Sequence, residues 1–136
     1  MVSAKRQQTM PSMTADRVRV WVVDDQASFR RAAVAMLATT KGFVLAGECE
    51  TGESAIELVG DDGAVMVLMD IHMPGMGGIE ATRRIRAAHP DVMVVLMSTY
   101  GLDDLPTGAT DCGAAGYVHK ENLTPVLLTR LWRAAD

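Results

Sequence analysis

The chain has 136 residues, of which 49% are hydrophobic, so its length suits one domain with a sizeable core. Its formal net charge of −4 argues against a nucleic-acid-binding surface that covers the whole domain. No apolar stretch approaches the length of a membrane span, and Lys5 and Arg6 interrupt the N-terminus where a secretory signal would be apolar. Cys49 and Cys112 lack metal-ligand spacing, which favours reduced, buried thiols.

The N-terminal part divides into a leader and the start of a domain. Residues 1–16 are polar and aperiodic, which predicts a disordered leader before a domain at 17–136. Residues 17–23 alternate and then turn apolar, which predicts a first strand ending at Asp24 and Asp25. Adjacent carboxylates raise each other's pKa, so we expect a positive charge nearby. A solvated turn that caps a helix at 28–39 is the alternative for this pair.

The central part of the chain carries the most informative stretch. A strand at 43–49 and a short helix at 51–59 precede the apolar run of residues 65–69, which leads straight into Asp70. Pro74 and three glycines then predict a loop before a helix at 79–88. Asp70 is therefore expected at the carboxyl end of a buried strand, where open parallel sheets bind ligands. It could serve there as a metal ligand, a general base or a nucleophile, or simply cap the turn.

The C-terminal part contains the weakest predicted helix. A strand at 92–97 ends at Ser98, and a helix is predicted at 101–113 although Gly101, Pro106 and Gly108 have poor helical propensity. Low local stability is expected in that segment. A short strand at 114–119 leads to Lys120, and a helix at 122–135 closes the chain.

The alternation of elements predicts the fold class and brings distant residues together. Five strands alternating with helices indicate an α/β fold, a doubly wound five-stranded parallel sheet of order 2-1-3-4-5. In that topology one edge of the sheet receives Asp24, Asp25, Asp70, Ser98 and Lys120. Three carboxylates alone would repel one another, and Mg²⁺, which prefers oxygen ligands, would resolve the conflict. A lysine and a hydroxyl added to such a site suit a phosphoryl group on Asp70.

The motifs at this edge, taken in order, resemble those of a known family. They are V-V-D-D at 22–25, D-I-H-M-P-G-M-G-G at 70–78, Ser98 after an apolar strand, and G-A-A-G-Y-V-H-K at 113–120. Together they resemble the response-regulator receiver domain of bacterial two-component signalling, over about residues 17–136 and with a flavodoxin-like fold. The chain is similar to receivers that precede helix-turn-helix output domains, although no output domain is expected within these 136 residues.

The resemblance implies a role for each matching residue. Asp70 would be the phosphoacceptor, and Ser98 and Lys120 would bind the phosphoryl oxygens. Mg²⁺ would be held by Asp25, Asp70 and the backbone carbonyl of His72, with Asp24 acting largely through water. Tyr117 would be the aromatic switch residue that turns inward when Ser98 is drawn to the phosphate. The signal would leave by the face that the predicted fourth helix, the fifth strand and the last helix form.

The resemblance also implies the partners and the setting. The phosphoryl donor would be a sensor histidine kinase or a phosphotransfer protein, and the receiver would act on a downstream target or output domain, with a homodimer as an open alternative. The protein would be a cytoplasmic regulator without membrane insertion or direct nucleic-acid contact. It would not be an enzyme beyond its own Mg²⁺-dependent phosphorylation and dephosphorylation.

Three other functions remain as alternatives. An aspartate-nucleophile phosphatase needs a second acid two residues after the nucleophile, and that position is His72. A flavin-binding module would need a phosphate-binding loop after the first strand, where Asp24 and Asp25 would repel a phosphate. A degenerate receiver used only for docking is disfavoured because every matching site residue is present.

Overall fold

The computed structural model describes residues 17–60, 63 and 65–134, so the predicted leader lies outside the described residues. The described part contains five strands: β1 (Val18–Val23), β2 (Phe43–Cys49), β3 (Met66–Asp70), β4 (Met93–Ser98) and β5 (Gly116–His119). Its α-helices are α2 (Ala27–Ala38), α3 (Gly52–Leu58), α4 (Gly77–Ala88) and α5 (Pro125–Ala134). Short 3₁₀ turns, η1 (Leu102–Asp104) and η2 (Lys120–Asn122), flank β5 in the chain. No described helix is long and apolar enough to cross a membrane.

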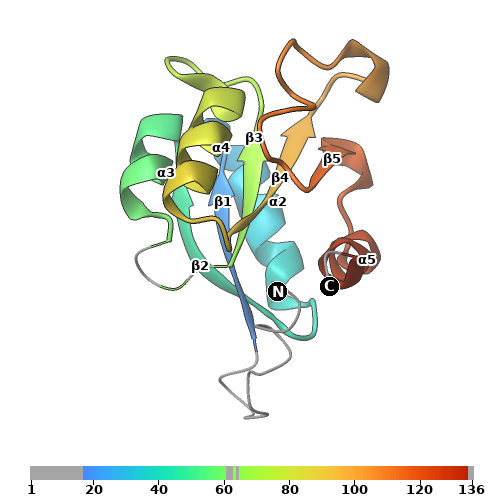
Figure 1. Ribbon diagram of the computed structural model, residues 1–136. Coiled ribbons are helices and arrows are strands. Elements are labelled where there is room, and N and C mark those ends of the chain that lie inside the picture. Colours follow the sequence, from blue (N-terminus) through green and yellow to red (C-terminus); the bar gives the residue numbers. More distant parts are fainter. Residues whose placement is uncertain (1–16, 61–62, 64, 135–136) are drawn as a thin grey trace.

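The strands form one parallel sheet of order β2-β1-β3-β4-β5 (Figure 1), which confirms the predicted topology. Because β1 lies between β2 and β3, the chain reverses its direction of winding there, and the carboxyl ends of β1 and β3 flank the switch point. The register pairs Val23 with Met69 and Asp70 with Met97. Asp24 therefore follows a strand that ends beside the end of β3.

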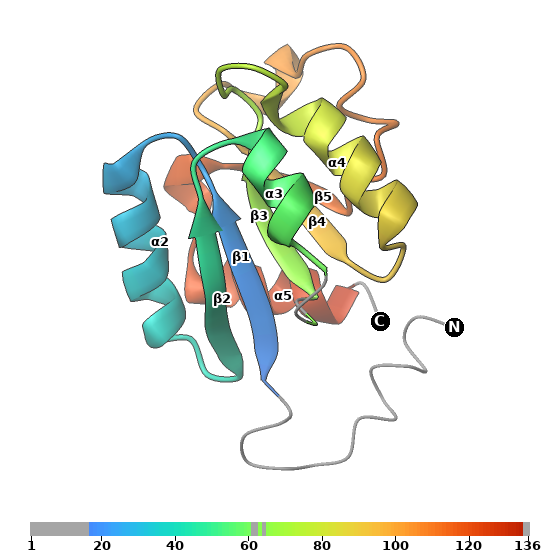
Figure 2. The same ribbon diagram turned by 90° about the vertical axis from the view of Figure 1, so that its left-hand side faces the viewer.

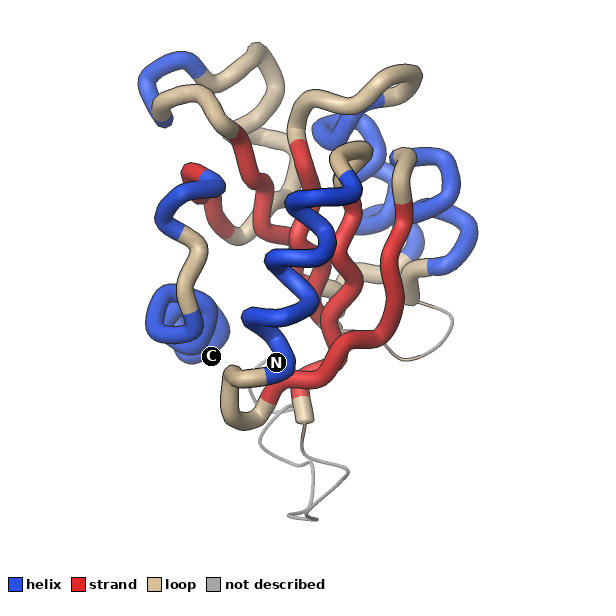
Figure 3. The backbone as a smooth tube through the Cα atoms, turned by 180° about the vertical axis from the view of Figure 1, so that it is seen from behind, coloured by secondary structure: helices blue, strands red, loops and turns tan. Residues whose placement is uncertain are grey.

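Helices cover both faces of the sheet, and each face has its own apolar cluster. Helices α3 and α4 pack side by side on one face (Figure 2), where Ala55, Ala81 and Ile85 meet the sheet. Helices α2 and α5 lie on the other face (Figure 3), where Leu37 and Leu128 are buried. Every residue of β3 and β4 is buried, as expected of central strands covered on both sides. The predicted burial of the two cysteine thiols is also confirmed.

The start of α4 touches the end of β3 so closely that only glycine fits there. The N–H of Gly78 donates to the carbonyl of Ile71 at 3.0 Å, and a Cβ on Gly78 would collide with the carbonyl oxygen of Asp70. Gly75, in the loop before α4, and Gly77, the first residue of α4, have φ angles of 81° and 79°, which glycine adopts without strain. The glycines after Asp70 thus let the helix begin directly against the strand that carries this carboxylate.

The prediction of a helix at 101–113 is wrong, because the segment 101–115 contains only the η1 turn and irregular backbone. Gly108 and Gly113 have φ angles of 91° and 96°, outside the helical region, and Pro106 cannot donate the hydrogen bond that a helix interior requires. Ala109 and Cys112 are nevertheless buried, so apolar anchors hold the segment against the α4 side of the core.

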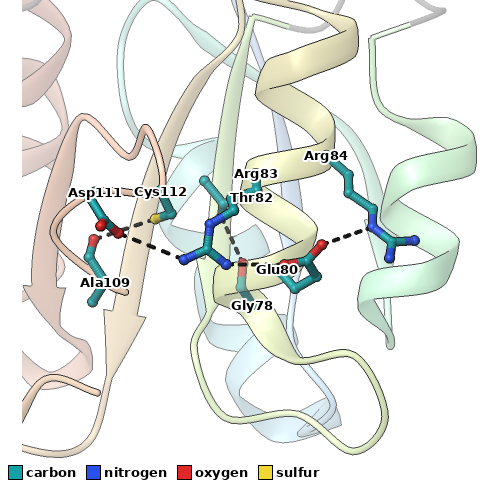
Figure 4. Close-up of polar contacts among 8 residues, drawn as sticks. All are labelled: Gly78, Glu80, Thr82, Arg83, Arg84, Ala109, Asp111 and Cys112. Carbon is teal, nitrogen blue, oxygen red and sulfur yellow. Dashed lines mark hydrogen bonds and ion pairs between the residues drawn. The ribbon is translucent and has the colours of Figure 1, made fainter. Parts of the chain in front are cut away.

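Polar contacts also join this segment to α4 (Figure 4). Arg83 lies between Glu80 of its own helix, at 3.0 Å, and Asp111 of the segment, at 3.7 Å. The Cys112 thiol contacts the carbonyl of Ala109 at 3.4 Å. The ion pairs are exposed at the surface and contribute little stability, so the buried Ala109 and Cys112 are the main attachment.

Gly78→Ala should destabilise the protein, because the added methyl group must displace the end of β3 or the start of α4. We expect the free energy of unfolding to fall by about 1–3 kcal/mol, measured by urea denaturation. Gly101→Ala is the matched control, since the nearest atom to its Cβ, the Asp104 carboxylate oxygen, lies 3.9 Å away. Equal stability of the two variants would contradict the close approach at Gly78.

Candidate acidic site at the carboxyl edge of the sheet

Two of the predicted site residues follow β1 and differ sharply in exposure. Asp24 is fully buried, whereas Asp25 is exposed. One carboxylate oxygen of Asp24 accepts a hydrogen bond from the Gln26 N–H at 2.8 Å, and the other lies 2.6 Å from the Lys120 ammonium. Both oxygens of Asp24 are therefore engaged within the protein, while the carboxylate of Asp25 faces solvent.

Asp70 ends β3 and is almost fully buried, with 3% of its surface exposed. Its Oδ1 accepts a hydrogen bond from the His72 N–H at 3.3 Å and lies 3.6 Å from the Lys120 ammonium. One carboxylate oxygen from each of Asp24, Asp25 and Asp70 lies within 4.8 Å of the other two. The structure thus brings together the three carboxylates that the sequence placed at one edge.

The lysine that balances these charges comes from the far end of the chain. Lys120 follows β5 and begins the η2 turn, and only 8% of its side chain is exposed. Its ammonium also lies 3.5 Å from the Gln26 amide oxygen and 4.6 Å from the centre of the Phe29 ring. A cation above an aromatic face is electrostatically favourable, so α2 helps to hold Lys120 between the carboxylates.

Burial and crowding perturb the acidity of Asp70. Its pKa is raised from an ordinary value of 3.8 to about 7, first by burial and then by the charge of Asp24, while the Lys120 ammonium and the His72 N–H act in the opposite direction. One lysine does not balance three carboxylates. The site consists of oxygen donors, which hard divalent cations prefer, so the acidic cluster could hold a metal ion.

The other predicted residues, Ser98 and Tyr117, lie on the two strands beyond β3: Ser98 ends β4 and Tyr117 is on β5. Ser98 is buried at the end of β4, one residue after the Met97 that pairs with Asp70, and its Oγ accepts a hydrogen bond from the Tyr100 N–H at 2.9 Å. Within the described part of the chain no acceptor for the Ser98 hydroxyl proton is seen, so this proton is available to a further acceptor. Tyr117, on β5, pairs with Leu96 of β4, two residues before Ser98 along β4.

Tyr117 lies beside the irregular segment, near Cys112 and Asp111. Its ring packs against the apolar cluster that includes Cys112. Burial, followed by the charges of Cys112 and Asp111, raises the pKa of the Tyr117 hydroxyl. The His72 side chain is exposed and lies edge-on to the Tyr100 ring, with ring centres 4.8 Å apart.

Two residues of this region were not predicted from the sequence. Arg30, from α2, donates to the carbonyl oxygen of Asp24 at 2.6 Å. Glu53, from α3, accepts a hydrogen bond from the Met76 N–H at 3.2 Å and so ties α3 to the loop after β3. The expectation of a positive charge near Asp24 was a signal for Arg30, because Arg30 lies in the first turn of α2, the helix that follows the acidic pair. Nothing in the local sequence around Glu53 indicates its contact.

The fold and site together define a class of protein: a doubly wound α/β domain with an acidic, lysine-balanced site at its switch point. A family model, the response regulator receiver domain, matches residues 20–131. The chain belongs to this family of two-component response regulators.

Curated relatives and solved structures agree with the family. Over 103 residues the chain is 41% identical to the response regulator GacA of Pseudomonas protegens and 36% identical to the response regulator UvrY of Escherichia coli. These alignments cover 76% of this chain but 48% and 47% of the relatives, so the chain spans about half the length of the curated relatives it matches.

The structural likeness extends over most of the chain. A LuxR-family two-component response regulator from Aurantimonas sp. is 28% identical with a TM-score of 0.77, covering 88% of this chain and 84% of that one. The response regulator domain of Thermotoga maritima CheB is 26% identical with a TM-score of 0.76, covering 87% and 96%. The flavodoxin-like receiver fold predicted from the sequence is confirmed.

The raised pKa of Asp70 predicts a specific dependence of stability on pH. Between about pH 4 and pH 7, Asp70 is protonated in the folded protein but ionised in the unfolded chain. The free energy of unfolding should therefore fall as pH rises through this window. In metal-free buffer at pH 8, Asp70→Asn should be more stable than the parent by about 2–4 kcal/mol, because the amide carries no charge.

Urea denaturation at pH 4 and pH 8, with a chelator present, would measure this difference. At pH 4 the two proteins should differ little, which serves as the internal control. A variant that is less stable than the parent at pH 8 would show that Asp70 is not strained by burial and by its acidic neighbour.

Proposed function

We propose that this chain is a phosphoacceptor receiver in which the Asp70 carboxylate takes a phosphoryl group from a sensor histidine kinase or a phosphotransfer protein. One Asp70 oxygen attacks the phosphorus atom as the bond from phosphorus to the donor's imidazole nitrogen breaks, and that nitrogen keeps the electron pair. The proposal is supported chiefly by one observation: a buried carboxylate lies 3.6 Å from a lysine ammonium, within a cluster of three carboxylates.

Each surrounding residue has a role suited to its position. The Lys120 ammonium lies between Asp24 and Asp70, so a small movement brings it to a phosphoryl oxygen on Asp70. The hydroxyl of Ser98, buried at the end of the neighbouring strand, donates a hydrogen bond to another phosphoryl oxygen. Together they stabilise the charge that the transferred group carries.

The acidic cluster fits Mg²⁺, which would supply positive charge to offset the negative charge of the phosphoryl oxygens. Asp25 and Asp70, with the backbone carbonyl of His72, are the proposed direct ligands. Asp24 would act through water, because both of its oxygens already have partners in Gln26 and Lys120. The exposed Asp25 carboxylate is free of such engagement among the described residues, which suits a direct ligand.

The other chemistries considered for this site have less support. A phosphatase of the aspartate-nucleophile type would need an acid at position 72, and the residue there is a histidine whose exposed ring lies against Tyr100. We infer that the chain is a regulator whose chemistry is its own phosphorylation and dephosphorylation. We propose that it acts on a downstream target or output domain; the curated relatives extend beyond the matched part over about half of their length.

The signal leaves through the face that includes β5, α5 and the irregular segment 101–115. This replaces the regular fourth helix expected from the sequence. Ser98 lies at one end of this stretch and Tyr117 beyond the other, and Tyr117 packs in the same cluster as Cys112 of the segment. A segment without regular helical hydrogen bonds has arrangements close in free energy, which a switch requires.

Treatment with acetyl phosphate and Mg²⁺ should add one phosphoryl group to the protein, measured by intact-mass spectrometry. Asp70→Asn should not be labelled, because an amide oxygen is a poor nucleophile, and excess chelator should abolish labelling of the parent. Ser98→Ala should be labelled more slowly, by about tenfold or more. Equal labelling of Asp70→Asn and the parent would place the acceptor elsewhere.

Hydrogen exchange with and without the phosphoryl mimic beryllofluoride should show its largest change in protection within residues 98–120. The physical reason is that Ser98 and Lys120 bind the mimic while Tyr117 and Cys112 couple them to the irregular segment. The matched control is Asp70→Asn, which should show no change. A response confined to α3, on the other side of the β3–α4 loop, would contradict this output face.

A further inference from the structure

Asp24 is fixed at its backbone as well as at its side chain. Its N–H donates to the carbonyl of Cys49 at 3.0 Å, and its carbonyl oxygen accepts from Nη1 of Arg30 at 2.6 Å. The Asp24 carboxylate in turn accepts from the Gln26 N–H. Both polar groups of the Asp24 backbone therefore have partners that come from neighbouring elements, β2 and α2.

Arg30 is itself anchored at a second point. Its Nε lies 3.2 Å from a carboxylate oxygen of Glu48 on β2, and only 14% of its side chain is exposed. The guanidinium thus spans from the end of β2 to the turn after β1. Arginine has five N–H donors in a rigid plane, so it can hold both partners at once, which the single ammonium of a lysine cannot do with the same geometry.

The carbonyl that Arg30 holds belongs to the peptide unit between Asp24 and Asp25. A peptide unit is planar, so fixing its oxygen also fixes the N–H of Asp25 and the direction in which its Cα leaves the turn. No hydrogen bond or ion pair to another described residue holds the exposed Asp25 carboxylate in place. The backbone of the turn is then the main determinant of where that carboxylate points.

We propose that Arg30 is a positioning residue for the acidic site: by holding the Asp24 carbonyl it aims Asp25 at the place where a divalent cation is bound. The inference rests on the proposed function, because it concerns the metal site of that function. Arg30 does not touch the metal or the phosphoryl group. It acts through the peptide between the two aspartates, with Glu48 as its support.

A simple counter-charge role for Arg30 makes the opposite prediction. Removing a cation beside three carboxylates makes the local potential more negative, which by charge alone strengthens the binding of Mg²⁺. Removing a positioning residue weakens it, because the ligand is no longer preorganised. The sign of the change in Mg²⁺ affinity therefore distinguishes the two roles.

The experiment compares the parent with Arg30→Ala, Arg30→Lys and Arg31→Ala. Mg²⁺ affinity is measured by titration of Trp21 fluorescence, since Trp21 lies three residues before Asp24 on β1. Arg31 is the matched control: it removes the same charge from the next, exposed position of α2. Hydrogen exchange of the metal-free proteins reports whether residues 24–26 lose protection while the rest of the sheet is unchanged.

Arg30→Ala should bind Mg²⁺ about tenfold more weakly and should lose protection at residues 24–26. Arg30→Lys should recover only part of the affinity, and Arg31→Ala should bind as tightly as the parent or slightly more tightly. Unchanged or tighter binding by Arg30→Ala would overturn the inference, as would full recovery by lysine. If the parent itself binds no Mg²⁺ while its exchange pattern responds to Arg30→Ala, the proposed metal site fails and the positioning of the turn stands.

Discussion

The rest of this structure depends on the confinement of like charges at one edge of the sheet. The parallel topology ends β1 and β3 side by side, so Asp24, Asp25 and Asp70 meet within 4.8 Å, and two of them are almost fully buried. Burial disfavours the charged form of Asp70 and, with the charge of Asp24, raises its pKa. The domain therefore has an edge that is stabilised by a proton or a cation and that remains strained without either.

The strain is sustained because the strands that carry the carboxylates are the most deeply buried part of the fold. All of β3 and β4 is buried between two helical layers, and Gly78 lets α4 start directly against the end of β3. Apolar burial on this scale outweighs the cost of a few desolvated charges. Beyond β4 the packing thins, and the segment 101–115 is attached mainly through Ala109 and Cys112. The tightest packing therefore lies where the carboxylates are held, and the more loosely attached segment lies where the proposed function passes the signal on.

The sequence predicted what depends on local pattern and on chain topology. Buried strands appear as apolar runs and glycine clusters as loops, so the strand order and the meeting of Asp24, Asp25, Asp70 and Lys120 followed from the sequence. The helix at 101–113 was predicted wrongly because alternation of elements outweighed its poor propensity, whereas Gly108 and Gly113 adopt backbone angles that a helix forbids. The contact of Arg30 with the Asp24 carbonyl depends on how α2 packs against β2. The acidic pair indicated that a positive charge lies nearby, but not which residue carries it.

The two cations beside the acidic site differ in how freely they can move, and this difference fits the proposed function. Arg30 belongs to a twelve-residue helix and is held by Glu48 as well as by the Asp24 carbonyl, so it is suited to a fixed role. Lys120 lies in a short 3₁₀ turn after β5, an edge strand that pairs only with β4. Its ammonium lies 2.6 Å from the Asp24 carboxylate and 3.6 Å from that of Asp70. A phosphoryl group on Asp70 would draw Lys120 away from Asp24, and this movement would be transmitted to β5, which carries Tyr117. Arg30 would then keep the carboxylates in place, while Lys120 would move when Asp70 carries a phosphoryl group.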